Sequence, residues 1–183
     1  MRRSRSSTPS GAGCEDGCET GRVNDRYAPE DHLGERTSLI AAAYVVLRRG
    51  DEVLLQQRAG TGYRDGYWAV LAGHVDRGES AHEAAVREAH EEAGVTIDPA
   101  ALRPLTTLHR FERGGPAVEQ RVDFFFEATR WSDEPSLREA DKASAMRWFP
   151  LDALPDPVVP HELDLLNLLR AGTAVPAVIS LPL

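Results

Sequence analysis

Short apolar runs separated by turn residues dominate the chain after residue 37, which is the pattern of β-strands. Residues 38–47 form an apolar, partly β-branched run, and residues 52–58 follow it after the turn at Arg49-Gly50-Asp51. These two runs predict neighbouring strands. Further strands are expected over residues 67–71, 102–111, 118–129 and 146–149.

Two segments have the pattern of helices. Residues 81–93 contain no proline or glycine, and Ser80 and Glu83 before them have the spacing of a capping box. Gly94 supplies the stop signal. Residues 161–170 carry leucines mostly at helical spacing, which predicts an amphipathic helix. Strands before, between and after two helices predict an α/β fold with a mixed sheet covered by helices on its faces.

The two ends of the chain differ from this middle part. Residues 1–37 are rich in Ser, Gly, Arg, Asp and Glu, so we expect a disordered N-terminal tail, 38–172 as one compact domain and 173–183 as a C-terminal tail. Cys14 and Cys18 fall in the first tail; they are incidental thiols, a disulfide, or half of a metal site. The sequence does not choose among these, and it does not indicate an oligomeric state.

Charge and hydropathy exclude several classes of protein. The net charge of −8 argues against binding of nucleic acid polymers, although a bound cation would still admit a small phosphate ligand. No apolar run approaches the eighteen or so residues that cross a membrane. The basic start has no apolar stretch after it, so we expect no secretory signal and a cytoplasmic protein.

The predicted helix over residues 81–93 carries an unfavourable set of charges. Glu88, Glu91 and Glu92 cluster at spacings of three and four residues in the last turns, where they repel each other and oppose the helix dipole. A divalent cation would relieve this, because Mg²⁺ takes hard oxygen ligands. The alternative is a solvated acidic helix with Arg87 paired to Glu83 or Glu91.

The spacing around these glutamates resembles a known signature. The chain reads Gly73-x5-Glu79-x7-Arg87-Glu88-Ala89-x-Glu91-Glu92-x-Gly94-Val95, which is similar to the box of the Nudix hydrolases with every fixed position filled. The resemblance implies a Nudix-type α/β/α sandwich. It also implies hydrolysis, by metal-activated water, of a diphosphate linkage in a nucleoside diphosphate joined to a group X.

The resemblance also assigns roles to residues of the box. Glu88, Glu91 and Glu92, with the carbonyl of Gly73, would hold Mg²⁺ or Mn²⁺, and Glu79 and Arg87 would orient the glutamates. Two residues outside the fixed positions are candidates for phosphate contacts, each with a structural role as the alternative: Arg58 and His74.

Other residues are weaker candidates. The general base is a box glutamate or a group from another loop, and three carboxylates outside the helix are further candidates for a ligand or base: Asp123, Glu127 and Glu139. Four aromatic side chains either stack on a base or belong to the core: Tyr67, Trp68, Phe111 and Phe124. The loop that carries Lys142 departs from the pattern of similar enzymes, so the resemblance assigns no substrate contact to Lys142.

The substrate is less determined than the chemistry. The sequence Gly-His-Val-Asp-x-Gly-Glu within the box resembles a subgroup related to nucleoside-triphosphate pyrophosphohydrolases, which favours a nucleoside triphosphate. ADP-ribose and dinucleoside polyphosphates are alternatives. Two further alternatives are a catalytically silent Nudix module that binds a nucleotide and a purely structural domain.

Overall fold

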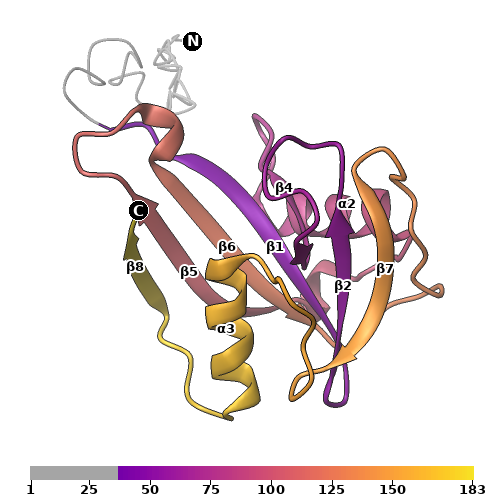
Figure 1. The fold of residues 1–183 in the computed structure, drawn as a ribbon. Coiled ribbons are helices and arrows are strands. Elements are labelled where there is room, and N and C mark those ends of the chain that lie inside the picture. The colour runs from indigo at the N-terminus through magenta and orange to yellow at the C-terminus, as the bar shows by residue number, and fades with distance from the viewer. Residues whose placement is uncertain (1–36) are drawn as a thin grey trace, which may run out of the picture. The chain divides into compact units, whose positions relative to one another are not determined.

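The computed structural model describes residues 37–183, and its centre is a mixed β-sheet (Figure 1). Strand β1 (Ile40–Arg49) pairs in parallel with β6 (Arg121–Ala128) and antiparallel with β4 (Leu71–His74). Strand β5 (Arg103–Phe111) is antiparallel to β6 and parallel to β8 (Val178–Pro182).

A second group of strands continues from the far end of β1. Strand β2 (Glu52–Arg58) follows β1 through a tight turn and pairs antiparallel with β7 (Ala143–Pro150) and with β3 (Trp68–Ala69). Two short 3₁₀ turns complete the connections: η1 (Pro99–Ala101) and η2 (Ala117–Glu119). The predicted strands are therefore present, with ends shifted by a few residues.

Alternation along β1 divides the core into two layers, because successive side chains of a strand point to opposite faces. Ala42, Tyr44 and Val46 pack toward helix α3 (Pro160–Arg170), whose Leu165 and Leu166 are buried there. The intervening residues of β1 pack instead toward helix α2 (Ala81–Ala93). The two helices lie on opposite sides of the sheet (Figure 1), which confirms the expected α/β/α sandwich.

Helix α2 has the predicted bounds and the predicted caps. Ser80 accepts a hydrogen bond from the Glu83 amide, Glu83 accepts one from the Ser80 amide, and Gly94 ends the helix in the left-handed conformation. Four alanines of one face are completely buried: Ala84, Ala85, Ala89 and Ala93. Their small side chains allow the helix to approach the sheet closely, which brings its acidic residues near β4.

The predicted strand over residues 67–71 is interrupted at Val70. The chain leaves β2, the partner of β3, and joins β1 as β4, so the Val70 amide has no ladder partner. The carboxylate of Glu162 on α3 accepts its hydrogen bond at 2.6 Å. A buried amide needs such a partner, and this contact ties α3 to the strand switch.

The predicted boundaries change at the C-terminus. Residues 173–183, expected to be a tail, contain β8, and Ile179 and Leu181 pack against the core on the α3 side. Pro182 ends this short edge strand, a position where its missing amide hydrogen is tolerated. Residues 1–36 of the predicted N-terminal tail, with Cys14 and Cys18, lie outside the described residues. Within residues 37–183, no helix is long and apolar enough to cross a membrane.

Candidate active site

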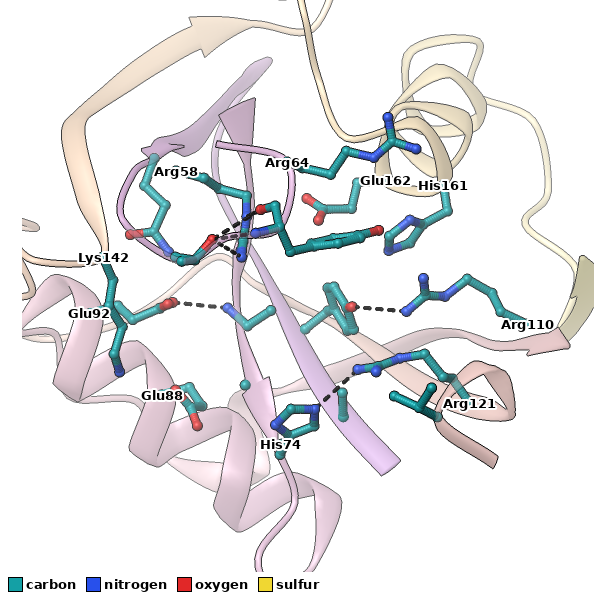
Figure 2. A pocket seen from close by; sticks show the side chains of 18 of the residues that line it. Arg58, Arg64, His74, Glu88, Glu92, Arg110, Arg121, Lys142, His161 and Glu162 are labelled. Atoms are coloured by element: carbon teal, nitrogen blue, oxygen red, sulfur yellow. Dashed lines mark hydrogen bonds between the residues drawn. The ribbon is translucent and has the colours of Figure 1, made fainter. Parts of the chain in front are cut away.

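One large pocket, with a volume of about 890 Å³, opens between α2, β4, the central strands and the start of α3. Figure 2 shows Glu88 and Glu92 on one side of this pocket, and Arg110, Arg121 and His161 on the other. The cavity therefore has an acidic wall and a basic wall, and it is large enough for a nucleotide-sized ligand.

The acidic wall consists of Glu88 and Glu92, one helical turn apart on α2. Their exposed fractions are 8% and 6%. Burial raises the pKa of Glu88, although Arg87 opposes this rise. Burial raises the pKa of Glu92 to about 8, against hydrogen bonding by Gln56 and the Ala72 amide. The Ala72 amide donates to Oε2 of Glu92 at 2.9 Å. Two buried like charges on one face are unfavourable without a cation between them.

Gly73 on β4 lies directly against the carboxylate of Glu88. A Cβ atom at this position would overlap both oxygens of that carboxylate, so there is space only for glycine. The backbone of Gly73 is outside the left-handed region, and the requirement is therefore one of space rather than conformation. This close approach places the Gly73 backbone and the Glu88 carboxylate at the same point of the pocket.

Arg87 connects the glutamates to the preceding loop. Its Nε and Nη2 donate to the two oxygens of Glu79 at 2.9 and 3.0 Å, which is the fork geometry expected for this pair. Nη1 donates to Glu88 at 2.5 Å and to Glu91 at 3.1 Å, and Nη2 also donates to the carbonyl of His74. The guanidinium therefore holds the start of α2, the box glutamates and the end of β4 in one arrangement.

Glu91 differs from the other two box glutamates in its direction. Its side chain is 47% exposed and does not line the pocket, and its contact is with Arg87. Over residues 37–183, no group of three acidic, histidine or cysteine side chains converges in the geometry of a metal site. The structure therefore brings together Glu88, Glu92 and Gly73 from the predicted ligand set, and it leaves Glu91 outside.

The basic wall begins with two arginines that face each other across the β5–β6 ladder. Arg110 and Arg121 are direct cross-strand partners, an arrangement that is unfavourable for like charges. Arg110 is neutralised by the buried Asp123, with Nε and Oδ2 2.5 Å apart. Arg121 has no carboxylate partner within residues 37–183; its Nη2 lies 3.2 Å from Nε2 of His74, and its buried Nε has no hydrogen-bond partner.

The loop over residues 59–66 borders the pocket and is built around Arg58. The Arg58 guanidinium donates to the carbonyl of Tyr63 at 2.9 Å and to the hydroxyl of Thr61 at 3.0 Å. Asp65 accepts hydrogen bonds from the Thr61 hydroxyl and amide. Arg58 therefore lines the pocket, with two of its nitrogen atoms engaged in shaping the loop that presents Tyr63 and Arg64.

The first turn of α3 contributes two buried polar residues, His161 and Glu162. Burial, reinforced by Arg110 and Arg121, lowers the pKa of His161 to about 3. Burial raises the pKa of Glu162 to about 8. Tyr44 lies beneath them in an edge-to-face contact with His161, with ring centroids 5.8 Å apart. Burial, with Asp123 nearby, raises the pKa of the Tyr44 phenol, so this hydroxyl remains protonated.

Comparison with known proteins agrees with this arrangement. A family model described as the NUDIX domain matches residues 38–169. The chain belongs to the Nudix family. The matched region contains the whole Nudix box, both pocket walls and the start of α3.

Two similar proteins are named as hydrolases of different substrates. The chain is 31% identical over 153 residues to the NAD-capped RNA hydrolase NudC of Pseudomonas aeruginosa, covering 81% of this chain and 51% of that protein. It is 36% identical over 147 residues to the human 8-oxo-dGDP phosphatase NUDT18, covering 80% and 42% respectively. The chain thus spans about half the length of the curated relatives it matches.

Solved structures give the same fold. A MutT NUDIX hydrolase from Burkholderia pseudomallei superposes with a TM-score of 0.64 at 26% identity, covering 71% of this chain and 97% of that one. The NUDIX domain of NrtR from Shewanella oneidensis, solved with ADP ribose, has a TM-score of 0.59 at 20% identity, covering 80% and 94%. The second likeness shows the Nudix fold alone.

Most of the other residues that the sequence suggested, as a general base or as stacking partners of a nucleobase, lie outside the pocket or in ion pairs. Two of the carboxylates proposed as a base are buried in ion pairs: Asp123 with Arg110, and Glu127 with Arg48 and Arg103. Glu139 pairs with Lys142 at 2.7 Å, and Lys142 lines the pocket. None of the four aromatic residues proposed to stack on a base lines the pocket: Tyr67, Trp68, Phe111 and Phe124.

Sequence reasoning missed most of the basic wall. Tyr44, Arg110, Arg121, His161 and Glu162 come from four separate elements, and no local motif joins them. One signal was available: Arg121 and Asp123 are charged residues in a strand whose other residues are mostly apolar. Charges in such strands are costly unless they are paired or face a polar site.

Proposed function

We propose that this Nudix chain is a hydrolase that cleaves a phosphoric anhydride in a nucleoside diphosphate linked to a group X. The observation that carries the proposal is the presence of uncompensated groups of opposite sign in one cavity: the buried carboxylates Glu88 and Glu92 on one wall, and Arg121, which has no carboxylate partner within residues 37–183, on the other. A cation stabilises the carboxylates and an anion stabilises Arg121, so a metal–phosphate ligand fits both walls.

The donor set of the acidic wall fits a hard divalent cation. Glu88 and Glu92 offer carboxylate oxygens beside the backbone of Gly73, and Mg²⁺ is commonly held by one or two carboxylates together with substrate phosphates. Mn²⁺ has similar ligand preferences. When bound, the ion would lower the pKa of a water molecule and neutralise charge on phosphate oxygens. Glu91 would join this set only after leaving Arg87.

The basic wall supplies the charge that a phosphate chain requires. Asp123 neutralises Arg110, Glu139 neutralises Lys142, and two nitrogen atoms of Arg58 shape its loop. Arg121 retains an unpaired positive charge within residues 37–183, next to His74. Arginine binds phosphate oxygens through its fork of donors. Arg121 and His74 are therefore the proposed contacts for phosphates on the side of the pocket away from Glu92.

A nucleoside triphosphate is the substrate class that we favour, on the resemblance of the box to that subgroup. The name of the human relative, 8-oxo-dGDP phosphatase, gives a nucleoside diphosphate as the substrate of a protein 36% identical to this chain; it supports a nucleotide substrate and not the triphosphate in particular. ADP-ribose, dinucleoside polyphosphates and NAD-linked ends are the competing members of the same chemical class.

The test is a panel of nucleoside triphosphates, ADP-ribose, NAD and dinucleoside polyphosphates, with release of phosphate, pyrophosphate and nucleoside monophosphate measured with Mg²⁺, with Mn²⁺ and with chelator. We expect metal-dependent cleavage of at least one member and its loss in Glu92→Gln. Arg121→Gln should raise KM, whereas Arg113→Gln, in the exposed turn after β5, is the matched control. Intact substrates throughout, with some of them raising the melting temperature, would replace the hydrolase with a nucleotide-binding module.

A further inference from the structure

His161 and Glu162 occupy a part of the pocket that the cleavage chemistry does not use. They project from the first turn of α3 on the side away from Glu88 (Figure 2). Their exposed fractions are 7% and 4%. Nε2 of His161 is buried without a hydrogen-bond partner among the described residues, although its residue lines the pocket. A buried polar atom without a partner is costly, and a ligand that enters the pocket is the available means of satisfying it.

Both side chains are uncharged near neutral pH. The pKa of His161 falls to about 3 and that of Glu162 rises to about 8, in each case chiefly because of burial. A neutral imidazole has one donor and one acceptor, and a protonated carboxyl group has an O–H donor and an acceptor oxygen. Glu162 uses one oxygen to accept the Val70 amide hydrogen, which leaves the other oxygen available.

We propose that His161 and Glu162, with the rings of Tyr44 and Tyr63, form a subsite that selects the nucleobase by hydrogen bonds to its polar edge. This inference rests on the proposed function, because it assumes that the ligand is a nucleotide. The four residues come from β1, the loop over residues 59–66 and α3, and all of them line the one pocket.

The chemistry of the subsite favours a base over a phosphate. An anion gains most from Arg121 and from the metal-binding wall, and it gains little from two neutral groups, one of which becomes negative above about pH 8. A planar uncharged heterocycle with adjacent donors and acceptors matches the neutral pair, and aromatic side chains offer it stacking surface. Sites that hydrogen-bond a polar ligand edge discriminate strongly, because an analogue without that edge leaves buried groups unpaired.

The variants for the test separate recognition from folding. His161→Phe keeps a ring against Tyr44 and removes both nitrogen atoms. Glu162→Gln keeps an acceptor for the Val70 amide and replaces the carboxyl O–H with amide N–H donors, whereas Glu162→Leu removes acceptor and donor. Asp164→Asn, an exposed position on the same helix that does not line this pocket, is the matched control. If Glu162→Leu does not fold, His161→Phe still decides the question.

The measurement is kcat/KM for nucleoside triphosphates that share one phosphate chain and differ in base. We expect His161→Phe to reduce the ratio between the best and worst base at least tenfold, with the value for the worst base within about twofold of wild type. Glu162→Gln and Asp164→Asn should largely keep the ratio. An unchanged ratio in His161→Phe, in an enzyme that remains folded and active, would overturn the proposal and leave the hydrolase standing.

Binding of phosphate-free nucleosides, followed by calorimetry, separates this proposal from the function on which it rests. If wild-type protein cleaves no nucleotide but binds one nucleoside, and His161→Phe loses that binding, the subsite is supported and the hydrolase is not. If neither nucleosides nor nucleotides show a preference for a base in wild-type protein, the subsite assignment is wrong.

Discussion

Substitution of Gly73 by alanine tests the closest contact of the proposed active site. The added Cβ would occupy the space of the Glu88 carboxylate. That carboxylate cannot move away freely, because it is buried between β4 and α2 and accepts a hydrogen bond from Arg87 at 2.5 Å. Gly73→Ala should therefore displace Glu88 and break this ion pair, while the backbone conformation at position 73 remains accessible to alanine.

The loss of folding stability in Gly73→Ala follows from the close packing at this position. Inserting a methyl group into a closely packed site costs about 1 to 3 kcal/mol, and a domain of this size loses roughly 2 to 4 °C of melting temperature per kcal/mol. A decrease of about 2 to 12 °C is therefore expected. Turnover should fall by about a hundredfold or more, because a shift of about 1 Å in a catalytic group has this effect.

Thermal denaturation measures the energetic coupling between position 73 and the Glu88 side chain. Four proteins are compared: wild type, Gly73→Ala, Glu88→Ala and the double variant. In the double variant the new methyl group meets no carboxylate, so Gly73→Ala should cost much less in the Glu88→Ala background than in wild type. Turnover should stay low in the double variant, because the proposed metal ligand is still missing.

Two results would refute this reasoning. A melting temperature unchanged in Gly73→Ala would show that the pocket accommodates the methyl group. An equal decrease in both backgrounds would show that the cost arises from the backbone rather than from Glu88.

Three other predictions concern single residues. Glu92→Gln should reduce metal-dependent turnover by at least about a hundredfold with little change in melting temperature, since burial raises the pKa of Glu92 to about 8 and the glutamine oxygen can still accept the Ala72 amide hydrogen; a decrease of many degrees would contradict this. Arg87→Lys cannot form the fork with Glu79, so the Mg²⁺ concentration for half-maximal rate should rise about 10- to 100-fold; an unchanged metal titration would argue against orientation by Arg87. Glu162 has a folded-state pKa of about 8, above its ordinary 4.5, so its stabilising effect is complete below pH 4.5 and is lost as pH rises toward 8. The melting temperature of Glu162→Gln relative to wild type should therefore increase between pH 5 and 8, and a constant difference would show that Glu162 is already ionised.

Local sequence patterns predicted the elements that depend on neighbouring residues. The bounds of α2 follow from Ser80, Glu83 and Gly94, because a capping box and a left-handed glycine act within one turn of the helix ends. The short strands follow from apolar runs between turns. The β8 strand was missed, because a short segment flanked by prolines has little intrinsic preference and gains its order from pairing with β5.

Local sequence patterns likewise predicted one part of the candidate site and missed another. Helical spacing alone places Glu88, Glu91 and Glu92 near each other, which fits either a cation site or a solvated acidic helix, and the resemblance to the Nudix box favours the cation site. Spacing does not show that Arg87 holds Glu91 outward while Glu88 and Glu92 are buried, because that depends on the direction in which α2 packs on the sheet.

The basic wall of the pocket depends on tertiary structure alone. Arg110 and Arg121 become neighbours through the register of β5 and β6, and His161 joins them because α3 packs across β1. Contacts between segments so distant along the chain arise from the packing of the whole core, and no local pattern records them. The sequence by itself therefore determined the helix, most strands and the resemblance to the Nudix family that the comparisons confirm. The tertiary structure decided which charges line the pocket and which buried polar groups of residues 37–183 have no hydrogen-bond partner, because both depend on how the helices pack on the sheet.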